Sequence, residues 1–163
     1  MSRALRIVLI DVAASLAVVL FANRGVAADD RDAIAVVVGI HSKIETVGID
    51  DLREIFLKRR RFWIDGSRLT PINSPADNPL RERFSRRVLG QSPQQMVSYW
   101  DRMFFNGINP PITLKSSAAV CAYLASDPTA IAYLPIAALG PGCPARTLLV
   151  LDNPESGRAT SVP

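Results

Sequence analysis

Residues 69–81 read LTPINSPADNPLR and contain the pattern that decides the fold of this 163-residue chain. The first five of these residues are mostly apolar or β-branched and predict a strand, which Pro71 keeps short. A polar loop follows, and Pro79 then occupies a first-turn position that suits a helix. The predicted helix continues to Leu89 and ends before Gly90. A strand, a loop and a helix in this order form the repeating unit of an α/β fold.

The segment upstream of this unit repeats the order of strand and helix. Ala33–Gly39 carries three consecutive valines and predicts a strand that is buried on both faces of a sheet. A helix is predicted to follow from Ile49, with Asp50 as its cap and with the positive charges of Lys58–Arg61 at its end. Trp63–Gly66 is predicted to form the turn before the next strand.

Helices and strands also alternate downstream. We predict a helix from a cap at Ser92 to about Phe105, and another from a cap at Ser116 or Ser117 to about Ser126. The first of these helices has an apolar stripe that is predicted to face the core, formed by Met96, Tyr99, Trp100, Met103 and Phe104. The remaining expected elements are strands at 130–134 and 147–151, with a helical turn at 135–139 between them. This alternation predicts an α/β sandwich with a mostly parallel sheet.

The N-terminal segment has the pattern of a secretory signal peptide. Two arginines precede an apolar stretch, and small residues precede a predicted cut after Ala28. A retained membrane anchor is the alternative, but a span needs about 20 apolar residues and Asp11 interrupts this stretch. Cleavage would lower the formal charge from +4 to +2, because Arg3, Arg6 and Arg24 leave together with Asp11.

The expected organisation is a signal peptide at 1–28, one domain at 29–152 and a flexible tail at 153–163. Export predicts a periplasmic protein, for which nucleic acid is not an expected partner.

The composition excludes several classes of catalytic and metal site. His41 is the only histidine, so a multi-histidine metal site is excluded, and it is either a surface residue or part of a site after the first strand. The sequence has no Gly-rich phosphate loop and no nucleophile elbow. We therefore expect no enzyme, no catalytic residue, no metal and no cofactor. Cys121 and Cys143 fit either a disulfide or two buried thiols.

Two predicted helix starts are candidates for an anion site. The helix at Pro79 follows a polar loop, so Ser74 and Asn78 can donate hydrogen bonds and Arg81 can add a charge-assisted pair. Ser117, after Lys115, offers the same chemistry at the later helix. The alternative is that these polar residues only cap their helices, and Asp77 would repel an anion at close range.

The basic run Lys58–Arg61 has two readings. Such a run is usually a solvated helix end, but it can also bind an acidic partner or a membrane surface.

Several of these segments together resemble a known family. Ile49–Lys58 followed by Phe62–Gly66, Leu69–Asn73 and Asp127–Leu134 resemble the second half of periplasmic phosphate-binding proteins of ABC importers. The chain from 34 to 152 is similar to the short, stand-alone members of this type 2 periplasmic binding protein superfamily. The resemblance implies a three-layer αβα sandwich equivalent to one lobe. It also implies a solute-binding protein for phosphate or a similar small anion, with an ABC permease or another periplasmic or membrane protein as partner.

The sequence departs from the family at two points. The chain is long enough for only one of the two lobes between which large members bind phosphate, so its affinity should be weaker. The Ser-Gly-Thr phosphate loop of the family corresponds to Asp77–Leu80, which lacks those small donors. An interaction or sensory module that has lost ligand binding is therefore the alternative hypothesis.

Overall fold

The computed structural model describes residues 33–151, so the predicted signal peptide and C-terminal tail lie outside the described residues. Within this part, strands form one sheet in the order β3-β2-β4-β1-β5. The strands are β1 (Ile34–Gly39), β2 (Thr70–Asn73), β3 (Ile112–Thr113), β4 (Ala130–Pro135) and β5 (Ala145–Leu151). β2 pairs in parallel with β3 and β4, whereas β1 is antiparallel to β4 and β5. All strands except β1 therefore run in one direction, which confirms a mostly parallel α/β sheet.

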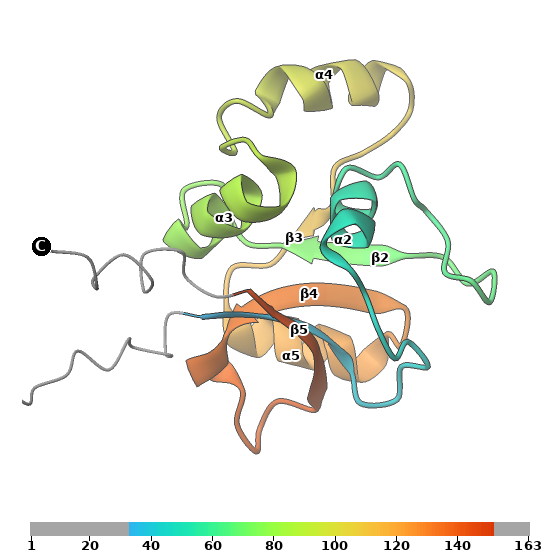
Figure 1. The fold of residues 1–163 in the computed structure, drawn as a ribbon, viewed down its shortest axis with the longest axis vertical. Coiled ribbons are helices and arrows are strands. Elements are labelled where there is room, and N and C mark those ends of the chain that lie inside the picture. The colour runs from blue at the N-terminus through green and yellow to red at the C-terminus, as the bar shows by residue number, and fades with distance from the viewer. Residues whose placement is uncertain (1–32, 152–163) are drawn as a thin grey trace, which may run out of the picture. The chain divides into compact units, whose positions relative to one another are not determined.

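Helices cover both faces of this sheet. The helical elements are α2 (Ile49–Phe56), α3 (Pro79–Phe84) with a π-helical continuation at Ser85–Leu89, α4 (Val97–Phe105), α5 (Ser117–Ser126) and a short 3-10 turn at Ile136–Ala138. Helices α2 and α3 pack on one face and α5 on the other, while α4 lies beyond α2 and α3 (Figure 1). This arrangement confirms the predicted three-layer sandwich.

The two cores are built by alternation along the central strands. Val36 and Val38 of β1 pack in the layer below α2 and α3, and Ala35 and Val37 pack below α5. All four are fully buried, as expected for a strand that is covered on both faces. The largest side chains of the first core are aromatic, and Phe84 stacks on Tyr133 with ring centroids 3.8 Å apart.

Several predicted helix boundaries are confirmed, but the cap and the end of α2 and the start of α4 are not. Helix α4 begins at Val97, five residues after the predicted cap Ser92. Ser116 caps α5 by accepting a hydrogen bond from the Ala119 N–H, and Gly90 ends the α3 segment in the left-handed conformation. The prediction that Asp50 caps α2 is wrong. The cap is Gly48, which is extended, and its N–H donates to the Asp51 carboxylate. Helix α2 also ends at Phe56, before the basic run begins.

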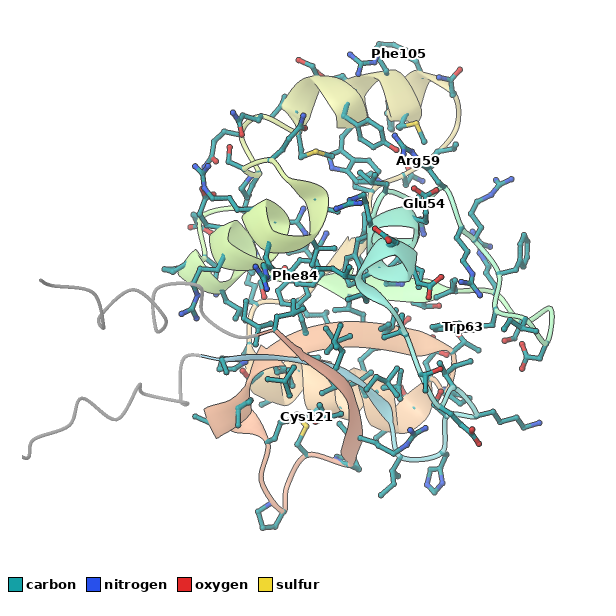
Figure 2. The ribbon with its side chains drawn as sticks, in the orientation of Figure 1. Glu54, Arg59, Trp63, Phe84, Phe105 and Cys121 are labelled. Carbon is teal, nitrogen blue, oxygen red and sulfur yellow. A yellow bond between two sulfur atoms is a disulfide. The ribbon has the colours of Figure 1, made fainter. Side chains whose placement is uncertain are left out.

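The predicted core stripe of α4 is mostly wrong. Of its five residues only Met96 is buried, and Phe104 is 63% exposed. The reason is that α2 and α3 already cover the sheet face, so α4 packs on the helical layer along one side only. Tyr99 fixes this side by donating from its hydroxyl to the Leu57 carbonyl, 2.7 Å away. The opposite side of α4 faces outward (Figure 2).

Two further features were not determined by the sequence. Strand β3 has only two residues and was not predicted. Cys121 and Cys143 form a disulfide that ties α5 to the loop before β5, so the disulfide alternative holds.

No helix between residues 33 and 151 is long and apolar enough to cross a membrane.

Candidate functional site

A cavity of about 220 Å³ lies where the parallel strands β3, β2 and β4 end. Its walls come from the loop after β2, the segment between β3 and α5, and the end of β4. The lining residues are Ser74, Asn78, Leu80, Leu114, Lys115, Ser116, Ser117, Val120, Leu134 and Pro135. Ligands of open α/β sheets bind at this carboxyl edge.

The structure brings three of the four predicted site residues together. Ser74, Asn78 and Ser117 all line the cavity, although 39 residues separate Asn78 from Ser117 along the chain. Lys115 and Ser116, from the second candidate segment, line it too. The two helix starts proposed as alternative anion sites are therefore two walls of one site. Arg81 is not among the lining residues.

Part of the polar lining is used to cap helices. The Asn78 side-chain oxygen accepts a hydrogen bond of 2.8 Å from the Leu80 N–H, and Ser116 Oγ caps α5. The amide nitrogen of Asn78 and the hydroxyls of Ser74 and Ser117 form no hydrogen bond within the described part of the chain. Helical capping and ligand donation are thus compatible for Asn78, because its two polar atoms serve different partners.

The charge of the cavity favours anions. Lys115 is the one ionisable residue in its lining, and no carboxylate lines it. Asp77, expected to repel an anion, is exposed and outside the lining. The N-terminus of α5 adds the partial positive charge of its unpaired N–H groups. A small oxyanion is the class of ligand that these donors suit.

Arg81 lies on the α3 side of the sheet, next to Tyr133. Its side chain is 7% exposed, and its Nε and Nη1 atoms have no hydrogen-bond partner among the described residues. Burial lowers the pKa of Arg81 and raises the pKa of Tyr133. A buried guanidinium without a carboxylate partner leaves uncompensated positive charge behind the loop that carries Ser74.

Tyr133 connects Arg81's surroundings to the cavity wall. Its hydroxyl accepts a hydrogen bond of 3.1 Å from the Ser74 N–H and donates one to the Asn73 side chain. Sequence analysis did not identify Tyr133. The feature that could have identified it is a phenol within an otherwise apolar strand, because a buried hydroxyl needs a hydrogen-bond partner. His41, the other candidate near a strand end, is exposed. Residues 33–151 contain no group of His, Cys, Asp or Glu that could hold a metal ion.

Comparisons of sequence identify no relative. No protein-family model matches the chain, and no curated protein matches it.

Comparisons of structure identify the fold. An ABC-type phosphate transport receptor from Vibrio cholerae superposes with a TM-score of 0.57 and 12% identity, over 72% of this chain and 45% of the receptor. A protein described as a phosphate ABC transporter substrate-binding protein, from Clostridium perfringens and with bound phosphate, gives a TM-score of 0.56 and 11% identity, over 72% and 44%. The chain therefore spans less than half the length of these proteins. Its fold is that of one lobe of a phosphate ABC transporter substrate-binding protein.

Proposed function

We propose that this chain is an exported, non-catalytic solute-binding protein whose cavity at the ends of β2, β3 and β4 binds phosphate or another small oxyanion. The observation that carries the proposal is the convergence of Ser74, Asn78 and Ser117, with Lys115, on one cavity without a carboxylate. The fold is similar to that of proteins described as a phosphate transport receptor and a phosphate ABC transporter substrate-binding protein, and this similarity supports the same class of ligand.

Each site residue has a distinct proposed role. Ser74 and Ser117 donate from their hydroxyls and Asn78 donates from its amide nitrogen. Lys115 supplies a charge-assisted hydrogen bond. Arg81 acts without contact, because its buried charge raises the positive potential behind Ser74.

The proposed affinity is low. One lobe leaves the anion open to water on the side that a second lobe would cover, so contacts and desolvation are lost. We place the dissociation constant near about 1 mM, which corresponds to a binding free energy of about 4 kcal/mol. Delivery of the anion to an ABC permease in the periplasm would fit a receptor of this kind.

The alternative function is an interaction or sensory module that has lost its ligand. It is favoured by the segment Asp77–Leu80, which lacks the small donors of the family's Ser-Gly-Thr phosphate loop.

A thermal melt of the chain with phosphate, sulfate, molybdate and small carboxylates separates the two functions. At 50 mM ligand and a dissociation constant of about 1 mM, binding stabilises the native state by about 2.3 kcal/mol. This would raise the midpoint by several degrees. Phosphate and sulfate also stabilise proteins as excluded salts, so the Ser74→Ala, Ser117→Ala double variant is melted in parallel. Equal shifts for both chains would reject anion binding at this cavity and favour the interaction module.

A further inference from the structure

The basic run Lys58–Arg61 is divided by the fold. Arg59 Nη1 lies 3.3 Å from Glu54 Oε1, and Arg60 Nη1 lies 2.8 Å from Asp51 Oδ1. Both carboxylates belong to α2, and Glu54 and Arg59 lie near one another in Figure 2. The middle two charges of the run are therefore compensated locally.

The outer two charges meet a third cation. Lys58 and Arg61 line a cavity of about 100 Å³ together with Arg68, Leu69 and residues 107–109, which follow α4. Within the part of the chain that the structure describes, none of the three forms an ion pair with a carboxylate. The pKa of Lys58 is lowered by burial and then by the charges of Arg68 and Arg61. This cation pocket therefore has uncompensated positive potential that an anionic group would relieve.

Backbone geometry places Lys58 at this pocket. Its φ angle of 58° lies in the left-handed region, which non-glycine residues seldom adopt. The N–H of Lys58 donates to the Ile55 carbonyl, while those of Arg59 and Arg60 both donate to the Glu54 carbonyl. The chain thus turns sharply at Lys58.

Exposed apolar side chains flank the cation pocket on the side of Arg68. Phe62 is paired with Arg68 in an isolated antiparallel bridge, so the two side chains lie on the same side of that ribbon. Phe62 is 55% exposed and Ile64, in the following turn, is 94% exposed.

The carboxylates nearest to this surface do not close the pocket. Asp65 accepts hydrogen bonds from the N–H and hydroxyl of Ser67 in the turn, and Asp101 is exposed on α4 one turn before Phe105. Neither lines the cation pocket.

These features define the kind of partner. A second copy of the chain would bring like charges together, which is unfavourable at short range. A free ion would satisfy the cations but leave the apolar side chains in water. A bilayer of anionic phospholipid provides phosphate groups at its surface and an apolar interior directly below them.

We infer that the face formed by Lys58, Arg61 and Arg68 with Phe62 and Ile64 docks on an anionic phospholipid bilayer. A lipid phosphate group occupies the cation pocket, and the apolar side chains enter the interfacial layer. This inference is independent of the proposed anion cavity, which lies at the other ends of β2 and β4.

The test is co-sedimentation of the full chain with phosphatidylglycerol-containing vesicles and with pure phosphatidylcholine vesicles at low salt. The N-terminal apolar segment is common to all variants, so the readout is the ratio of the two partition coefficients. The pocket variant carries Lys58→Gln, Arg61→Gln and Arg68→Gln. The control carries Arg59→Gln, Arg60→Gln and Arg86→Gln, which removes the same charge from residues that are paired with carboxylates.

We expect the ratio to fall about one hundred-fold in the pocket variant, since each of the three basic residues contributes about fivefold at an anionic surface. In the control it should change by about threefold or less. Equal losses in the two variants, or no preference of the native chain for phosphatidylglycerol, would overturn the inference. Binding of 10 mM inorganic phosphate that Arg68→Gln abolishes, without vesicle binding, would also overturn it and assign the pocket to free anions. Arg68→Gln alone serves if the triple variant does not fold.

Discussion

The Tyr133 hydroxyl donates a 3.2 Å hydrogen bond to the side-chain oxygen of Asn73, and this contact joins the carboxyl ends of β4 and β2. The same hydroxyl accepts a hydrogen bond from the Ser74 N–H, so one phenol fixes the start of the loop that forms a wall of the proposed anion cavity. Both Tyr133 and Asn73 are buried, and water does not replace such a bond easily.

Removal of this hydroxyl should destabilise the fold. Tyr133→Phe leaves the Asn73 oxygen and the Ser74 N–H without their partner, and we expect a loss of about 1–3 kcal/mol in the free energy of unfolding. Urea unfolding measures it. Tyr123→Phe is the matched control, because the Tyr123 hydroxyl forms no hydrogen bond with any residue of 33–151 and its loss should cost less than about 0.5 kcal/mol. Equal effects of the two substitutions would contradict the assigned role.

The buried phenol of Tyr133 should also lower the free energy of unfolding in alkali. Burial raises its pKa above the ordinary value of 10.0, so the native chain keeps this proton to a higher pH than the unfolded chain. The unfolded state then binds fewer protons, and the free energy of unfolding must fall as the pH rises above about 10. Urea midpoints at pH 9 and pH 11 should show a smaller decrease for Tyr133→Phe than for the native chain. An equal decrease would show that this phenol does not contribute.

Arg81 gives the opposite expectation for stability. Its guanidinium is buried with two nitrogens unpaired, so Arg81→Met should be neutral or should raise the free energy of unfolding by about 1 kcal/mol in the absence of anions. Arg87→Met, at an exposed position on the same helical segment, should change it by less than about 0.5 kcal/mol. A loss of more than about 1 kcal/mol for Arg81→Met would mean that Arg81 stabilises the fold itself.

The disulfide should contribute to stability through the unfolded state. Cys121 and Cys143 close a loop over a separation of 22 residues, for which chain entropy predicts about 3 kcal/mol. The Cys121→Ala, Cys143→Ala variant should lose about this amount in urea unfolding under oxidising conditions. Addition of a thiol reductant should lower the urea midpoint of the native chain and leave that of the variant unchanged. An unchanged native chain would contradict the structural role of the bond.

The sequence predicted helix boundaries correctly where the residue type at the boundary has one common structural role. Ser116 could satisfy an orphan N–H of α5, and Gly90 could adopt the left-handed conformation that ends the α3 segment. Asp50 was misassigned because Asp50 and Asp51 both lie in the first turn of α2, where an acid resembles a cap in the sequence. Backbone geometry determines the cap: Gly48 is extended, and its N–H donates to the Asp51 carboxylate.

Long-range placement was beyond the sequence. The periodicity of Met96 to Phe104 indicated one apolar side correctly, but it could not reveal that α2 and α3 already cover the sheet. Likewise, the run Lys58–Arg61 gave no sign that Arg59 and Arg60 pair with α2 while Lys58 and Arg61 meet Arg68. In the anion cavity, Ser74 and Ser117 were identified from their helix starts, whereas their convergence required the topology of the sheet.

The most direct test of the account is a calorimetric titration of phosphate into the chain at constant ionic strength. The account predicts saturable binding with a dissociation constant of about 1 mM, and this constant should rise at least tenfold in the Ser74→Ala, Ser117→Ala double variant. Ser98→Ala with Ser126→Ala, two exposed serines away from the cavity, should bind as the native chain does. Binding that is absent in the native chain, or that the two double variants weaken equally, would contradict a phosphate site at the ends of β2, β3 and β4.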